Sequence, residues 1–82
     1  MAKVYGAMTN ATISVPRCKY VVEEFALDIM GWTASQLRYA QDYNGFPLPV
    51  RGMSVLVLET DDIARWARSR QYQVVRHTIG GT

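Results

Sequence analysis

A polar run on one expected helix holds the side chains best suited to binding chemistry. With Leu37 and Ala40 facing the core, the other side chains point outward or lie at the flanks. These side chains are Ser35, Gln36, Arg38, Tyr39 and Asp42, of which Asp42 would repel phosphates unless it accepts from cytosine. Glutamine pairs with adenine and arginine with guanine, while serine and tyrosine reach phosphates or base edges. Any solvated helix face carries the same residue types, so base contact and plain solvation both stay open here.

Catalytic chemistry has no such support in this sequence. The single histidine, His77, is expected in a tail, and the single cysteine, Cys18, on the apolar face of a helix. The paired acids at 23–24 and 61–62 are adjacent on helices, so their side chains diverge by about 100°. No phosphate-binding glycine loop, nucleophile elbow or metal-ligand cluster occurs. We therefore expect a protein that is not an enzyme and uses no cofactor or metal.

Composition places the chain among small globular domains. It has 82 residues, of which 49% are apolar and 20% charged, with a formal net charge of +2. Four arginines and no acid occur from residue 65 to 82: Arg65, Arg68, Arg70 and Arg76. Such an excess attracts phosphate or is simply solvated. The lone cysteine favours a reduced compartment, and the opening residues read as neither a signal peptide nor a membrane span, so we expect a cytoplasmic protein, and a nucleoid-associated one if the polar run contacts bases.

Two consecutive helices must position the polar run. Apolar residues at steps of three and four predict a first helix over 16–30, which Gly31 ends. Thr33 and Gln36 form a capping box for a second helix over 34–43. So short a connection implies two helices meeting at a sharp angle, which is a helix-turn-helix arrangement.

The second half of the chain predicts a hairpin, a helix and a strand. The prolines in residues 46–49 keep that segment extended, and a hairpin follows from 50–51 and 55–58 around a turn at 52–54. Thr60 is expected to cap a third helix anchored by Trp66, with an ion pair from Asp61 to Arg65.

Residues 72–78 favour a strand, and 79–82 are expected to fray. Because 55–58 is apolar on both faces, we expect residues 72–76 or the N-terminal arm to cover it.

These elements define the predicted fold class, which is mainly α with a small β-hairpin wing. The expected architecture is a winged helix-turn-helix of three helices plus a short antiparallel hairpin. The expected organisation is an N-terminal arm over 1–14, the winged domain over 15–70, and a C-terminal tail over 71–82 that forms a strand and then becomes disordered.

Three segments carry a resemblance to a known family. They read GWTASQL at 31–37, GFPLPVR at 45–51 and TDDIARW at 60–66. In these segments, over about residues 20–70, the chain resembles the winged-helix excisionase and AlpA family, which is related to MerR-type DNA-binding domains. The most specific part is the FPxPxR string with its spacing from Leu37. Two features depart from the family: a shorter wing, and Ala40 where relatives often have tryptophan.

The resemblance implies that the second helix enters the DNA major groove and that Arg51 and the wing tip approach the neighbouring minor groove or backbone. Arg68 is a further candidate for phosphate, from its lack of nearby acids. The expected DNA-contacting residues are Thr33, Ser35, Gln36, Arg38, Tyr39, Arg51, Met53, Ser54 and Arg68.

By the same resemblance, the expected function is that of an excisionase, or recombination directionality factor, of a phage or integrated element. It would bind repeated sites and bend DNA so that an integrase excises. The expected partners are double-stranded DNA, integrase and further copies side by side on DNA, with no membrane. Two alternatives within DNA binding are an AlpA-like transcriptional regulator and a terminase small-subunit module. An alternative of another class is a protein-interaction adaptor.

Overall fold

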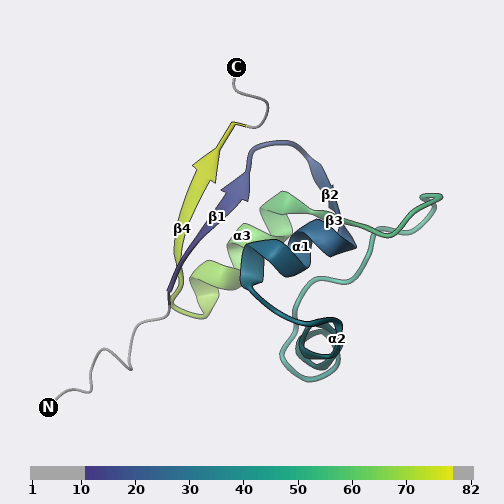
Figure 1. The fold of residues 1–82 in the computed structure, drawn as a ribbon, viewed down its shortest axis with the longest axis horizontal. Helices are drawn as coiled ribbons and strands as arrows, with labels where there is room; N and C mark the ends of the chain where they lie inside the picture. The colour runs from purple at the N-terminus through teal and green to yellow at the C-terminus, as the bar shows by residue number, and fades with distance from the viewer. Residues whose placement is uncertain (1–10, 79–82) are drawn as a thin grey trace, which may run out of the picture.

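The computed structural model describes residues 11–78 of the chain (Figure 1). Three helices and two two-stranded sheets make up this part. In chain order they are β1 (Thr12–Pro16), β2 (Tyr20–Val22), α1 (Glu23–Met30), α2 (Ala34–Tyr43), β3 (Val57–Glu59), α3 (Thr60–Ser69) and β4 (Gln73–His77). The expected combination of helices with a small amount of strand is confirmed at this coarse level. In the described part, no helix is long and apolar enough to cross a membrane.

The two ends of the described segment are held together by a parallel strand pair. β1 and β4 pair over their full lengths, from Thr12 opposite Gln73 to Pro16 opposite His77 (Figure 1). β1 alternates over its first four residues, because Ile13 and Val15 are buried whereas Thr12 and Ser14 are exposed. The strand expected within 72–78 is therefore confirmed, and β1 occupies part of the segment expected to be an arm. The fraying expected at 79–82 lies outside the described residues.

The second strand pair joins the start of α1 to the start of α3. β2 runs antiparallel to β3, with Val21 opposite Leu58. Both of these side chains are buried, and Leu58 is fully enclosed by the core. Because α1 follows β2 directly and α3 follows β3 directly, this short pairing fixes where both helices begin.

The prediction of a first helix over 16–30 was wrong in its first half. The helix begins only at Glu23, and Gly31 ends it with a left-handed φ of 71°, as expected. Pro16 ends β1, and Tyr20–Val22 forms β2 instead of helical turns. Aromatic and β-branched residues suit a strand, and here β3 supplies a hydrogen-bonding edge for them.

Cys18 does not lie in a helical core face, which corrects a second expectation. It is exposed in the bend between β1 and β2, where its thiol lies 3.3 Å from the carbonyl oxygen of Tyr20.

Exposure of Cys18 gives a direct chemical prediction. The folded protein should react with an aromatic disulfide reagent within minutes and without denaturant, at a rate close to that of the unfolded chain. Absorbance of the released thiolate measures this rate. A reaction that begins only when urea unfolds the protein would contradict the exposed position.

The expected hairpin over 50–51 and 55–58 was also wrong. A single backbone hydrogen bond, 2.8 Å from the amide of Val50 to the carbonyl of Val57, closes this loop. Only Val57–Glu59 forms a strand, and its partner is β2. Only two residues lie between Pro49 and Gly52, which is too short a segment for a ladder of strand hydrogen bonds. Pro49 cannot extend this segment, because proline has no amide hydrogen to donate.

The expected cover over residues 55–58 is not present in the described part of the chain. β4 pairs with β1 rather than lying on this segment. Leu58 is buried, but Leu56 is 57% exposed and Val55 is equally open. An apolar surface therefore stays accessible beside the start of α1.

The start of α3 differs from its prediction in two contacts. Thr60 is the first helical residue rather than its cap, and its buried hydroxyl donates to the carbonyl of Cys18. Arg65 pairs with Asp62 at 2.7 Å instead of with Asp61. Asp61 pairs with Arg76 of β4 at 3.1 Å, so this acid links α3 to the last strand.

An aromatic cluster joins the three helices and the last connection. Trp66 contacts the rings of Trp32, Phe46 and Tyr72, with centroid distances of 5.8, 4.9 and 6.1 Å. Its indole nitrogen donates to the carbonyl of Asn44 at 2.8 Å. The expected role of Trp66 as the anchor of the third helix agrees with these contacts, which hold both ends of α2 against the body.

Candidate nucleic-acid interface

A reciprocal cap fixes the start of α2. The backbone amide of Gln36 donates to the hydroxyl of Thr33 at 3.2 Å. In return, the backbone amide of Thr33 donates to Oε1 of Gln36 at 2.8 Å. The predicted capping box is confirmed, and it satisfies two donors that a helix start otherwise leaves without partners.

The inner side of α2 is narrow, which leaves most of the helix open. Leu37 and Ala40 are its buried residues. Beyond them, Gln41 donates its side-chain amide to the carbonyl of Pro47 at 3.1 Å. Figure 1 shows α2 nearly along its axis and set apart from the body formed by α1 and α3. The helix is thus held by one side and both ends, and its outward face meets solvent.

The outward face carries the residues expected there. Ser35, Arg38 and Asp42 are exposed, and so is Tyr39. The guanidinium of Arg38 has no hydrogen bond or ion pair with any described residue, so it is available to an external acceptor. Asp42 adds a negative charge to the same face, which favours a ligand with both donors and acceptors over a purely anionic one.

Tyr43 belongs to this face but was not predicted. It is 73% exposed, and its ring lies 4.9 Å from the ring of Tyr39, which is 60% exposed. The i,i+4 spacing of the two tyrosines in the sequence was the signal for this contact. Together they present aromatic and hydroxyl groups on the exposed side of α2.

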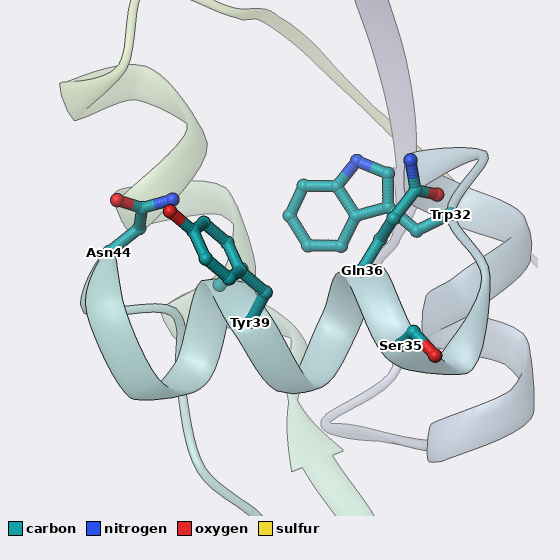
Figure 2. Close-up of a pocket in the computed structure, with 6 residues that line it drawn as sticks. Trp32, Ser35, Gln36, Tyr39 and Asn44 are labelled. Carbon is teal, nitrogen blue, oxygen red and sulfur yellow. The ribbon is translucent and has the colours of Figure 1, made fainter.

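A shallow hollow runs along one flank of α2. Its volume is about 330 Å³, and Ala40 and Trp32 contribute its apolar lining. Figure 2 shows Tyr39 and Asn44 close together at one end of this hollow, Gln36 at the other, and the Trp32 ring between them. Trp32 and Asn44 were not among the predicted site residues. The hollow combines an apolar floor with amide and hydroxyl groups at its rim.

The loop over 50–56 provides a second exposed segment. Arg51, Met53 and Ser54 are all exposed, and Gly52 turns the chain with a φ of 85°. Like Arg38, Arg51 makes no hydrogen bond or ion pair to the described residues. In Figure 1 this loop and α2 project from the body in different directions, both away from the β1–β4 pair.

Arg68 is not brought together with α2. Trp66 marks the side of α3 that faces the end of α2, and Arg68 is two residues further on, about 160° around the helix. Arg70 lies on the α2 side instead. Its guanidinium stacks over the Trp66 ring, 5.3 Å from the centroid, and donates to the carbonyl of Asn44. The structure thus groups α2 with Arg70, and leaves Arg68 on another surface.

The predicted site residues fall into three groups. Ser35, Gln36, Arg38 and Tyr39 share α2, with Thr33 at its start. Arg51, Met53 and Ser54 share the loop, and Arg68 stands apart on α3. Within residues 11–78 no cluster of histidine, cysteine or acids could hold a metal ion. Comparison with protein-family models, curated proteins and solved structures found no match to this chain.

Proposed function

We propose that the chain is a DNA-binding protein with a helix-turn-helix fold that inserts α2 into the major groove, with the loop over 50–56 in the place where a winged fold has its hairpin. The observation that carries this proposal is the outward face of α2. It is a capped helix held by Leu37 and Ala40, and it exposes an arginine that has no partner among residues 11–78. A major groove about 12 Å wide admits one helix, and its base edges and flanking phosphates match these side chains.

In the proposed complex the two exposed segments have different tasks. Arg38, Ser35 and Tyr39 face base edges and the nearest phosphates. Arg51, in the role of a wing residue, approaches the neighbouring backbone or minor groove. Removal of a base contact should weaken binding to the preferred site most, because only base contacts depend on DNA sequence. Removal of a phosphate contact should weaken binding to every duplex.

We further propose that the biological role is that of an excisionase. Copies of the chain bind side by side on repeated sites, bend the DNA and assist an integrase in excision. The low net charge of +2 supports binding by several copies, since few phosphate contacts per copy give weak binding alone. The exposed Leu56 and Val55 offer an apolar surface for contact between neighbours.

Binding measurements on the full chain test the DNA proposal. Fluorescence anisotropy with labelled 30-base-pair duplexes would compare wild type with Arg38→Ala and Arg51→Ala. We expect Arg38→Ala to weaken binding to the preferred site about 5- to 150-fold, the loss of roughly 1–3 kcal/mol that one base contact provides. Arg51→Ala should weaken all duplexes alike and make the logarithmic salt slope shallower by about 1.

Arg65→Ala is the matched control, because it removes the same charge from an exposed ion pair on α3. We expect this variant to bind like wild type. Equal losses of DNA affinity in all three variants would mean that only the net charge of the protein matters. Negligible, salt-insensitive binding by wild type would remove the proposal entirely.

Footprinting separates excisionase from transcriptional regulator. Tandem protections about 10 base pairs apart beside an attachment site, with retarded migration of the bent DNA, support the first. A single protected promoter operator supports the second.

One observation favours a second function, that of a protein-interaction adaptor. Leu56, Val55 and Val22 are exposed around a hollow of about 510 Å³ that Glu23 and Glu24 border. Such a surface suits a partner with apolar and basic side chains. A Leu56→Ser variant that binds a duplex with a single site normally but loses a protein partner would support this second function alongside the first.

A further inference from the structure

The capping box restricts what Gln36 can read. Its Oε1 accepts the backbone amide of Thr33 at 2.8 Å, and this bond belongs to the folded helix start. Bidentate pairing with adenine needs the amide oxygen of glutamine as acceptor as well as its nitrogen as donor. The cap uses one of the two lone pairs of this oxygen and fixes the orientation of the side-chain amide, so adenine could pair only through the second lone pair in that fixed orientation. The Nε2 group, which has no hydrogen bond in the described part of the chain, stays free to donate.

The side chains around Nε2 limit which base can accept its hydrogen bond. The hollow beside Gln36 has the Ala40 methyl and the Trp32 ring in its lining, and Tyr39 stands next to it (Figure 2). A base that places an acceptor against Nε2 should therefore also place an apolar group in this hollow. An unfilled apolar hollow against the DNA would lose the contact that its lining offers.

Only one base presents that pair of groups in the major groove. Thymine has the O4 acceptor next to the C5 methyl group. Guanine presents two acceptors without a methyl, cytosine presents a donor, and adenine sets a donor beside its acceptor. Resting on the proposed DNA-binding function, we propose that α2 reads a thymine, with Gln36 Nε2 donating to O4 and the C5 methyl seated in the hollow beside Ala40 and Trp32.

Base substitution in a selected site tests this assignment. Duplexes that bind the full chain are first enriched from a library with 20 randomised base pairs. Each thymine of the preferred site is then replaced by uracil, which removes the methyl group and keeps O4. We expect one uracil position to weaken binding about fourfold, which corresponds to the ~0.8 kcal/mol of one buried methyl group. Uracil at the other positions should have little effect.

A variant of Gln36 separates reading from capping. Gln36→Glu keeps an oxygen for the amide of Thr33, because glutamate also completes a capping box. Because the cap is kept, the thermal midpoint of unfolding should stay unchanged. The substitution does replace the free Nε2 donor with an acceptor. Binding to the selected site should weaken about tenfold or more, and renewed selection should replace the thymine by cytosine, whose amino group donates.

The control for the added charge is Gln73→Glu on the exposed part of β4, away from α2. This variant should select the same site as wild type. Failure to enrich any duplex would contradict DNA binding itself, and the thymine assignment with it. Enrichment of a site in which no uracil weakens binding, or selection of the same bases by Gln36→Glu, would overturn the thymine assignment alone.

Discussion

Trp66→Ala will lower the free energy of unfolding by about 3–5 kcal/mol. The large effect is expected because this ring contacts Trp32, Phe46 and Tyr72 and donates to the carbonyl of Asn44. Truncation of the Trp66 side chain opens a cavity between α2, α3 and the connection from α3 to β4. The total free energy of unfolding of a small domain is about 5–15 kcal/mol, so the variant should be partly unfolded at 37 °C. Urea titration followed by circular dichroism at 222 nm measures the loss.

Trp66→Phe distinguishes the ring contacts from the hydrogen bond. It keeps most of the apolar volume and removes the indole donor, while Arg70 still donates to the same carbonyl of Asn44. We therefore expect a loss of about 1–2 kcal/mol. A loss in Trp66→Ala no greater than that of Trp66→Phe would contradict the central place of this ring in the core.

Arg76→Met will destabilise the protein by about 2–4 kcal/mol. The guanidinium of Arg76 donates to the carbonyls of Val15 and Pro16 at 3.2 and 3.0 Å and to the hydroxyl of Thr60 at 3.2 Å. Methionine keeps an apolar stem of similar length, but it leaves these acceptors without their donor. The exposed pair with Asp61 adds little by comparison. Urea titration gives the magnitude, and hydrogen exchange of residues 73–77 shows whether β4 separates from β1.

Arg65→Met is the matched comparison. Arg65 pairs only at the surface, with Asp62, and we expect its replacement to change stability by less than about 1 kcal/mol. Equal effects of the two substitutions would show that the contacts of Arg76 with the backbone carbonyls contribute no more than a surface charge.

Local sequence signals predicted the elements whose ends are set by neighbouring residues. Gly31 ends α1 because a left-handed φ closes a helix there, and the threonine and glutamine at 33 and 36 cap each other across one turn. The Gly31 amide bonds to the carbonyl of Leu27, four residues earlier, and the two capping residues are three apart. Residue types and spacing were therefore sufficient to predict both helix ends. The exposed polar face of α2 follows from the same helix once Leu37 and Ala40 are assigned to the core.

Distant pairing explains the errors in the first strands. Ile13 and Val15 alternate with exposed residues, which is a strand signal, but β1 forms against β4 about 60 residues later in the chain. The spacing of Val15, Cys18 and Val22 imitates a helical period without forming one. The hairpin failed for the same reason, since β3 pairs with β2 rather than with its sequence neighbour.

Side-chain contacts between distant elements were harder to predict than the location of the candidate site. Nothing local in the sequence indicates that Arg76 donates to carbonyls of β1, or that Trp32 and Asn44 border a hollow beside α2. Such arrangements depend on how the three helices pack. The commitment of Gln36 to its cap was implicit in the spacing, but its consequence for base reading needed the hollow next to it.

The most direct test of the account maps the DNA-binding surface on the protein itself. Uniformly 15N-labelled chain would be titrated with a short duplex carrying its selected site, and amide shifts recorded residue by residue. If α2 enters the major groove, the largest changes should occur at residues 33–43 and 51–54, with small changes in β1 and β4. Changes concentrated in the β1–β4 pair, with α2 unaffected, would contradict the placement of α2 in the major groove.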